Sequence, residues 1–414
     1  MIKRVVVTGL GVISPIGNDV DTYWDSLVNG KCGIDFITRF DISDTKIKIA
    51  AEVKDFDPSL YLDRKECKRL DLFAQYAMVA AMEAVNDSGI EGSIDSDRFG
   101  VYVGSGIGGM DTFVKETEKL LTAGPKRVSS LFIPMMISNM AAGNIAIKYN
   151  AKGPSLPVVT ACATSTNAIG EAFRAIKFGY ADAIIAGGAE AAVCPLAIAG
   201  FTNCMALSTT NDPLNSSIPF DKRRDGFVMG EGAGIIILEE YEHAKKRGAK
   251  IYAEVVGYGN TCDAYHITAP HPEAEGAYKA IELCMKEAGK EQEDSIYINA
   301  HGTSTPLNDK SETLAIRRAL GERADKAFVS STKSMTGHML GAAGAAEAIA
   351  CILALKNNIL PPNIGYKEKD EDCDLNYIVG GAITKSVNTA FSISLGFGGH
   401  NGCLAFVKES EGDK

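Results

Sequence analysis

The sequence lacks an uninterrupted apolar segment of about 18 residues, the length that a membrane-spanning helix requires. Its N-terminal run, MIKRVVVTGLGVISPIG, places Lys3 and Arg4 before a short apolar stretch, as a signal peptide would. Gly9, Gly11 and Pro15 interrupt that stretch, however, and no cleavage-site pattern follows. We therefore expect a first β-strand here, no insertion into a membrane, and a cytoplasmic location.

Metal-binding and disulfide patterns are also missing. The ten cysteines include no C-x-x-C pair, and the six histidines form no ligand-like pair. We therefore expect no metal site, and most cysteines should be reduced thiols in the core. Positive charge is in deficit, because the formal net charge is −10, and this disfavours a general nucleic-acid-binding protein.

The 414 residues are 46% hydrophobic, which is enough for a large core. Short runs rich in Val and Ile predict buried strands at 4–9, 100–105, 157–161, 182–188, 251–259, 295–302, 326–332 and 389–396. Helical patterns lie between them, most clearly at 70–89, 163–178, 276–289 and 340–356. This alternation predicts an α/β fold with mostly parallel strands.

The order of elements in residues 1–250 recurs in residues 251–414, so we expect two related halves. Two excursions, at about 105–150 and 190–232, are rich in Gly, Pro and Met and suggest loop structure near a site. In the helix at 340–356, residues 341–346 are glycines and alanines only. Such a helix is expected to lie very close to another backbone.

The stretch GSGIGG (104–109) follows a predicted strand and matches the G-x-G-x-x-G pattern of dinucleotide-binding proteins. That pattern also requires an acidic residue at the end of a second strand, about 20 residues later. Here Glu116 and Glu118 fall inside a helical run instead. A glycine-rich wall that another group can approach closely is the better interpretation.

Cys162 stands where the predicted strand 157–161 meets the predicted helix 163–178. At the N-terminus of a helix, the dipole and the free N–H groups are expected to lower the pKa of a thiol and favour a nucleophilic thiolate. A buried, inert thiol at a tight turn is the alternative, and these residues alone leave both interpretations open.

Two polar loops each follow a predicted strand of the second half, AHGTSTPLND (300–309) and STKSMTGHMLGAAG (331–344). They carry His301 and His338, and Lys333 lies five residues before His338. Because α/β folds place their sites at the carboxyl ends of strands, we expect these groups near Cys162. Two imidazoles suit a reaction in which N–H donors hold an enolate oxygen.

These motifs resemble those of the β-ketoacyl-acyl-carrier-protein synthases of the type I/II class, and most closely the synthase II group. The resemblance runs from end to end. Its motifs include VTGLGVISPIGN (7–18), TACAT (160–164), PFDKRRDGFVMGEGAG (219–234), GFGGHN (396–401) and the two histidine loops. A Cys-His-His set separates this class from the initiating synthases, which use Cys-His-Asn, and from thiolases, which use a second cysteine.

The resemblance implies an α/β, thiolase-like fold of two βαβαβαββ halves in a five-layered α-β-α-β-α arrangement, and a homodimer. Residues 1–250 would carry the nucleophile, and residues 251–414 the two histidines. The implied activity is that of an acyltransferase that elongates fatty acids by two carbons through a decarboxylating Claisen condensation. No resident cofactor is implied, because the phosphopantetheine arm arrives on the acyl carrier protein.

The resemblance also assigns roles to residues. Cys162 would take the acyl chain as a thioester, and the backbone N–H groups of Cys162 and Phe397 would form the oxyanion hole. His301 and His338 would bind the malonyl thioester oxygen. The other implied roles are orientation of this array by Lys333 with Glu347 and Asp309, pantetheine binding by Thr303 and Thr305, gating by Phe397, and acyl-pocket lining by Ile107, Phe201 and Phe132.

The implied partner is acidic, so docking would use local positive charge. The candidates are two clusters, Arg64, Lys65, Lys68 and Arg69 in one and Lys126 and Arg127 in the other. An ordinary solvated helix face is the alternative for such runs. The sequence also departs from the family pattern, because Met205 stands where many relatives have arginine and Ile393 and Leu395 replace the common Asn and Phe.

Three other functions remain possible at this stage. A condensing subunit of a polyketide pathway would share these motifs, although Ile107 and Phe201 favour an apolar chain. A catalytically silent partner subunit would lack the nucleophile, and Cys162 argues against it. An NAD-dependent oxidoreductase would need GSGIGG to bind a dinucleotide.

Overall fold

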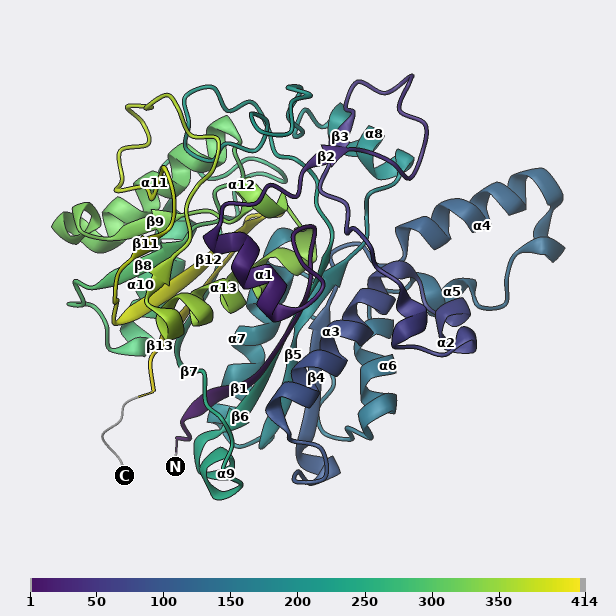
Figure 1. Ribbon diagram of the computed structural model, residues 1–414, viewed down its shortest axis with the longest axis horizontal. Coiled ribbons are helices and arrows are strands. Elements are labelled where there is room, and N and C mark those ends of the chain that lie inside the picture. The colour runs from purple at the N-terminus through teal and green to yellow at the C-terminus, as the bar shows by residue number, and fades with distance from the viewer. Residues whose placement is uncertain (1, 410–414) are drawn as a thin grey trace.

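A nine-stranded mixed sheet organises the computed structural model of the chain, which describes residues 2–409 (Figure 1). In spatial order its strands are β4 (Phe99–Gly104), β5 (Ala183–Glu190), β6 (Gly232–Glu240), β1 (Val5–Ile13), β7 (Ala253–Cys262), β13 (His400–Val407), β12 (Thr389–Gly396), β8 (Ile296–Asn299) and β9 (Phe328–Ser330). Two small sheets pair β2 (Asp35–Phe36) with β3 (Ile49–Ala50), and β10 (Ile359–Leu360) with β11 (Ile383–Thr384).

The expectation of mostly parallel strands is wrong. Only the outer strands are parallel within the described sheet, β4 with β5 on one side and β12, β8 and β9 on the other. The inner strands β6, β1, β7 and β13 pair antiparallel with one another and with β5 and β12. The sequence analysis missed β6 and β13. Their sequences begin with glycine or polar residues directly after glycine-rich motifs, which masked the strand signal.

The strand predicted at 157–161 is also absent. The segment begins beside β4, where Ser155 bridges Val101 and the Leu156 N–H donates to the Val101 carbonyl at 3.0 Å. Residues 157–160 then form no strand, and the chain enters the short 3-10 helix η4 (Ala161–Ala163). The Val and Thr residues of this run favour a strand, but the segment lacks a partner strand within the described chain.

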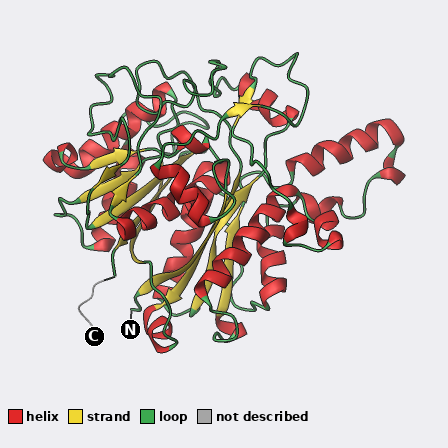
Figure 2. Ribbon diagram, in the orientation of Figure 1, coloured by secondary structure: helices red, strands yellow, loops and turns green. Residues whose placement is uncertain are grey.

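The helices cover the sheet on both faces (Figure 2). In chain order they are α1 (Val20–Val28), α2 (Arg64–Arg69), α3 (Leu72–Ser88), α4 (Met110–Ala123), α5 (Phe132–Met136), α6 (Met140–Tyr149), α7 (Thr164–Lys177), α8 (Pro195–Asn203), α9 (Tyr241–Lys246), α10 (Glu275–Ala288), α11 (Pro306–Leu320), α12 (Lys333–Thr336) and α13 (Ala343–Asn357). Two predicted helices end at their glycines, because Gly89 and Gly289 adopt the left-handed conformation that caps α3 and α10.

The helices and the two parts of the sheet, one from each half of the chain, form five layers. Helix α3 packs on the β1–β6 side of the sheet, and α10 packs on β7 and β13 at the opposite outer surface. Helices α7 and α13 lie between, because α7 contacts β5 and β7 while α13 contacts β6 and β12. The α-β-α-β-α arrangement implied by the resemblance is therefore confirmed. The domain division at residue 250 stays a prediction.

The glycines and alanines at the start of helix α13 are explained by its close contact with α7. A methyl group added to Gly344 would lie 2.0 Å from the Thr166 hydroxyl of α7, so the two backbones approach as closely as expected.

Among the described residues, one helical stretch, Leu340–Asn357, is long and apolar enough to cross a membrane. It is 89% buried inside the structure, as a core helix would be.

Candidate active site

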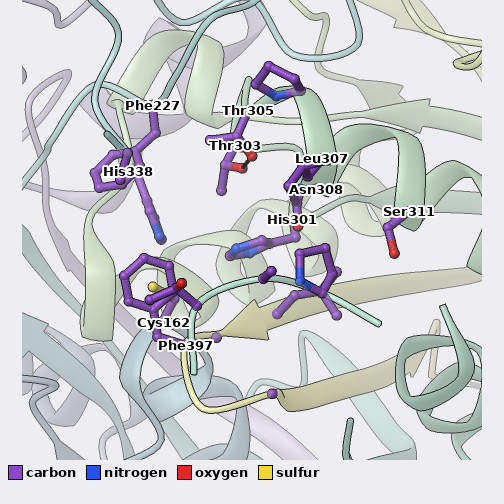
Figure 3. Close-up of a pocket in the computed structure, with 18 of the residues that line it drawn as sticks. Cys162, Phe227, His301, Thr303, Thr305, Leu307, Asn308, Ser311, His338 and Phe397 are labelled. Carbon is purple, nitrogen blue, oxygen red and sulfur yellow. Dashed lines mark hydrogen bonds between the residues drawn. The ribbon is translucent and has the colours of Figure 1, made fainter. Parts of the chain in front are cut away.

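A cavity of about 400 Å³ opens where several strands of both halves end. Its walls include Cys162 in η4, His301 in the loop after β8, His338 in the loop after α12, and Phe397 directly after β12 (Figure 3). The imidazole rings of His301 and His338 converge above Cys162 and Phe397 (Figure 3). The structure thus brings together the four residues that the sequence analysis placed at the centre of the site.

Cys162 differs from expectation in its electrostatics. Burial raises the pKa of its thiol to about 12, and the ammonium group of Lys333 only partly offsets this. The prediction of a lowered pKa is therefore wrong. Helix α7 begins at Thr164, two residues after Cys162, so the loss of hydration outweighs the helix terminus. The resting thiol is protonated at neutral pH.

The backbone of Phe397 reaches the nucleophile. Its N–H group hydrogen-bonds to the Cys162 sulfur and favours the thiolate. The preceding Gly396 makes this approach possible, because a methyl group there would lie 3.2 Å from the Cys162 nitrogen. The N–H groups of Cys162 and Phe397 are therefore close together, as the oxyanion-hole expectation requires.

His301 is held through its backbone. The carboxylate of Glu312, on α11, accepts hydrogen bonds from the N–H groups of His301 at 2.6 Å and Gly302 at 2.7 Å. Burial lowers the pKa of His301 well below its usual range, and the charge of Lys333 acts in the same direction. The imidazole is consequently neutral at physiological pH.

His338 is fixed in the same manner by a neighbouring strand-like segment. Its N–H donates to the Val228 carbonyl at 2.7 Å, and its carbonyl accepts from Gly230 at 2.8 Å. The Phe227 ring packs edge-on against the imidazole, with 5.1 Å between ring centroids. The rings of His338 and His301 lie 5.2 Å apart and nearly perpendicular. Burial lowers the pKa of His338 well below its usual range too.

Lys333 is the first residue of α12 and forms a buried ion pair with Glu347 of α13. Burial raises the pKa of the Glu347 carboxyl, and the ammonium group opposes that shift. Asp309, which was expected to support Lys333, occupies another place. It accepts hydrogen bonds from the N–H groups of Phe220 and Ser304 and lies 3.7 Å from Arg224. It therefore supports the loop of His301 rather than the lysine.

Thr303 and Thr305 line the cavity on the His301 side, with their hydroxyl oxygens 3.0 Å apart. The buried Arg224 holds the chain that follows. Its guanidinium donates to the carbonyls of Thr305 at 3.4 Å and Pro306 at 3.2 Å. The two hydroxyl groups are thus presented together at the cavity wall.

Three residues other than glycine adopt left-handed backbone conformations in the loops of the site. They are Ala161 at φ 51°, Ser304 at φ 68° and Leu340 at φ 48°. Each lies within three residues of Cys162, His301 or His338. Such conformations cost about 1–3 kcal/mol each and concentrate at functional sites.

The three predicted acyl-pocket residues have different positions. Phe201 lines the cavity, with its ring centroid 6.3 Å from that of Phe397. Ile107 belongs to the same apolar cluster as Cys162 and Phe201. Phe132 lies on α5 beside Phe113, with ring centroids 6.3 Å apart, and does not line the cavity within the described chain.

The glycine-rich loop that follows β4 binds a carboxylate from its own chain. Glu190, at the end of β5, accepts hydrogen bonds from the Ser105 hydroxyl and from the N–H groups of Gly106 and Ile107. These N–H groups correspond to the ones that would approach a phosphate in a dinucleotide site. The loop therefore acts as a close-packed wall, and the oxidoreductase interpretation loses its basis.

The six basic residues proposed for docking are all exposed. Arg64, Lys65, Lys68 and Arg69 lie on α2, and none of them forms an ion pair with another described residue. Lys126 and Arg127 lie in η3 (Pro125–Arg127), at the tip of the projecting α4 segment and apart from α2 (Figure 1). Within one chain, the two clusters do not form a single patch.

Three residues that shape the site were not predicted from the sequence. Glu312, Glu190 and Phe227 hold His301, the glycine-rich loop and His338, respectively. A single glutamate or phenylalanine stands in no characteristic sequence spacing, so the sequence alone does not mark it as part of a site. Only Phe227 lay in a motif already noted, PFDKRRDGFVMGEGAG.

Comparison with known proteins identifies the family. The sequence profile described as "Beta-ketoacyl synthase, N-terminal domain" matches residues 2–244, and "Beta-ketoacyl synthase, C-terminal domain" matches residues 252–367. The chain is 54% identical over 408 residues to the 3-oxoacyl-[acyl-carrier-protein] synthase 2 of Synechocystis sp., covering 98% of each protein.

Solved structures agree. A beta-ketoacyl synthase from Burkholderia phymatum superposes with a TM-score of 0.92 at 36% identity, covering 99% of this chain and all of that one. A type II polyketide ketosynthase in complex with its acyl-carrier protein superposes with a TM-score of 0.90 at 35% identity, with the same coverage. The chain belongs to the β-ketoacyl synthase family and is an acyltransferase with a thiolase-like fold.

Proposed function

We propose that the chain is a 3-oxoacyl-acyl-carrier-protein synthase of type 2, which condenses malonyl-carrier protein with an acyl chain held on Cys162. The observation that carries this proposal is the convergence of Cys162, His301 and His338 on one cavity. The identity of 54% with a relative of that name, over nearly the whole chain, supports it.

In the first half-reaction, the Cys162 sulfur attacks the thioester carbonyl of the acyl-carrier protein. The N–H groups of Cys162 and Phe397 hold the oxyanion of the tetrahedral intermediate. The carrier thiol then leaves and takes the proton that Cys162 releases. Because the thiol is protonated at rest and the leaving group is also a thiol, this exchange consumes no net proton.

In the second half-reaction, malonyl-carrier protein loses carbon dioxide and becomes an enolate. His301 and His338 are neutral, so each can donate one N–H to the thioester oxygen as charge develops there. Both Nδ1 atoms are buried without a partner among the described residues, which favours Nε2–H as the donor on each ring. Burial is the main cause of their neutrality, and the nearby charge of Lys333 acts in the same direction.

The enolate carbon attacks the carbonyl of acyl-Cys162. The carbon–carbon bond forms, the carbon–sulfur bond breaks, and the Cys162 thiolate takes up one proton from solvent, which balances the negative charge of the malonyl carboxylate that left as carbon dioxide. The product is a 3-oxoacyl chain, two carbons longer, on the carrier. Phe397, flanked by Gly396 and Gly398, can exclude water while the enolate exists.

The substrate arm and chain have separate walls. Thr303 and Thr305 present adjacent hydroxyls that suit the amides of phosphopantetheine, which arrives on the carrier so that no resident cofactor is needed. Phe201 and Ile107 give an apolar surface for the acyl chain. This surface favours a fatty chain over the polar intermediates of a polyketide pathway.

We further propose that the chain is a cytoplasmic homodimer and that it docks the carrier through α2 and η3.

The dimer interface is proposed at the extended segment that lacks a partner strand, where Leu156 and Val159 are 49% and 48% exposed. Pairing with the same segment of a second copy would cover both side chains and give the backbone N–H and C=O groups of this segment hydrogen-bond partners. Val159→Arg should then yield a monomer by light scattering, whereas an unchanged dimer would contradict this interface.

The histidine roles are tested by separating the half-reactions. His338→Ala should still form acyl-Cys162, but carbon dioxide release from malonyl-carrier protein should fall by about two orders of magnitude or more. Cys162→Ala should show the reverse pattern, with decarboxylation and no acyl-enzyme. Condensation at the wild-type rate in either variant would contradict the assignment.

A further inference from the structure

Glu190 is a buried carboxylate that the reaction steps above do not use. It ends β5, it is fully buried, and it accepts four hydrogen bonds. The donors are the Ser105 hydroxyl at 2.7 Å and the N–H groups of Gly106 at 2.9 Å, Gly341 at 3.1 Å and Ile107 at 3.2 Å. No described lysine or arginine forms an ion pair with it, so these donors alone stabilise its charge.

These four donors come from two segments that lie directly against each other, because a methyl group on Gly341 would lie 2.5 Å from the Gly106 nitrogen. Ser105, Gly106 and Ile107 follow β4, whereas Gly341 lies in η6 (Leu340–Ala342), between His338 and α13. The fit is close. A methyl group on Gly106 or on Gly341 would lie 2.8 or 2.7 Å from the same Glu190 oxygen. The carboxylate therefore fixes the distance between the two segments.

Burial raises the pKa of the Glu190 carboxyl, and its four hydrogen bonds oppose that shift by favouring the ionised form. An acid suits these four partners better than an amide. All four groups are donors, and a glutamine would direct its own N–H₂ at some of them. Leaving a buried donor without an acceptor costs about 1–3 kcal/mol. Ile107, which this carboxylate positions, belongs to the apolar cluster that contains Cys162 and Phe201.

The same charge reaches the nucleophile. Glu190 raises the pKa of the Cys162 thiol, and it opposes the effect of Lys333 there. The carboxylate is also near in space, because a methyl group on Gly106 would lie 2.8 Å from a Glu190 oxygen and 3.4 Å from the carbonyl oxygen of Ala161, the residue before Cys162. Removal of either charge should shift the reactivity of the thiol in a direction that can be stated beforehand.

We propose that Glu190 is a positioning residue of the condensing reaction, which holds the Ile107 wall of the acyl pocket against the Gly341 segment and keeps a negative charge beside the Cys162 sulfur. Only the first part of this inference, the positioning of the acyl-pocket wall, rests on the proposed function. The effect on thiol reactivity concerns the free enzyme and needs no substrate.

The test uses Glu190→Gln and Glu190→Asp in the full chain. Glu190→Gln removes the charge, so alkylation of Cys162 by iodoacetamide at about pH 8 should become up to about tenfold faster, the ratio for one pKa unit. Glu190→Asp keeps the charge but retracts it, so alkylation should stay within about twofold of wild type while acylation falls and its chain-length preference changes. Malonyl decarboxylation should change less, because His338 is held by Val228 and Gly230.

Glu83→Gln is the matched control. Glu83 is another largely buried carboxylate, and it accepts from the N–H groups of Val12 and Val20. This variant should lose stability without altering alkylation of Cys162. Glu190→Gln that alkylates no faster than wild type, or Glu190→Asp with unchanged acylation at every chain length, would overturn the proposal. If the wild-type enzyme accepted no acyl donor at all, the proposed function would fail while the alkylation result still stood.

Discussion

Lys333 and Glu347 form an ion pair that is almost completely shielded from solvent, with side chains only 1% and 3% exposed. The pair joins the loop of His338 to the core helix α13. Its ammonium group also lowers the pKa values of both catalytic-site histidines and of Cys162. Burial has the larger effect on each of these three groups, and the ammonium group adds to it at the histidines and opposes it at Cys162.

Breaking this pair should reduce stability and activity by different mechanisms. Lys333→Met leaves Glu347 buried without its counter-ion, and we expect a loss of about 3–5 kcal/mol in the free energy of unfolding. The double variant Lys333→Met/Glu347→Leu should recover most of that loss in urea denaturation. Condensation should remain defective in both. A double variant as unstable as Lys333→Met would contradict this account.

Acid should destabilise the protein through its buried histidines. The pKa of His338 is well below 6.5 in the folded state, so below about pH 6.5 only the unfolded chain takes up the proton readily. The contribution of His338 to the free energy of unfolding should then fall by about 1.4 kcal/mol for each pH unit below that value, and should be constant above it.

The measurement compares wild type with His338→Gln, because their difference cancels all other titrating groups. The cancellation matters, since burial raises the pKa of Glu312 to about 8 and that of Glu83 to about 7, which acts in the opposite direction. The difference in unfolding free energy should shrink as pH falls from about 6.5. A difference that is constant with pH would show that His338 titrates normally.

Two helical glycines should respond oppositely to alanine. At Gly344 of α13 the new methyl group would meet the Thr166 hydroxyl at 2.0 Å, so we expect a loss of about 1–3 kcal/mol. At Gly143 of α6 the nearest atom outside the helix backbone is the Met140 sulfur at 3.9 Å, so we expect a gain of about 0.5–1 kcal/mol. Thermal unfolding measures both. Equal effects would mean that helix propensity, not the close approach of α7, governs Gly344.

Carrier docking should depend on α2. Lys68→Glu should raise the KM for acyl-carrier protein several-fold with little change in kcat, and added salt should reduce the difference from wild type. Lys279→Glu is the control, because Lys279 is also exposed but lies on α10, paired with Glu275 at 3.1 Å. An acyl-pantetheine donor without the carrier should reveal no defect. Equal effects of both substitutions would exclude a specific docking role for α2.

The sequence predicted the elements that short-range rules govern. The strand expected at 389–396 is β12, and the glycine caps placed the ends of α3 and α10. These rules failed where the structure depends on contacts between segments that are distant in the sequence. Strand β6 contains the apolar run 235–238 but begins within a glycine-rich motif, and β13 begins with polar residues; the antiparallel pairing of both depends on neighbours far along the chain.

The site shows the same division. Motifs and the family resemblance found Cys162, His301, His338 and Phe397, and the structure places them around one cavity. The thiol pKa was predicted in the wrong direction, because burial depends on all surrounding elements and not on one helix terminus. Glu190 was missed for a related reason, since its four donors lie far from it in sequence.

Intact-protein mass spectrometry tests the central claim most directly. The protein would be mixed with a long-chain acyl-carrier protein and then with malonyl-carrier protein, with Cys162→Ala as the control. We predict a mass gain of one acyl group that maps to Cys162 and is discharged as a 3-oxoacyl chain two carbons longer on the carrier. No mass gain with any acyl donor, or a gain that persists in Cys162→Ala, would contradict the assignment of Cys162 as the nucleophile of a condensing enzyme.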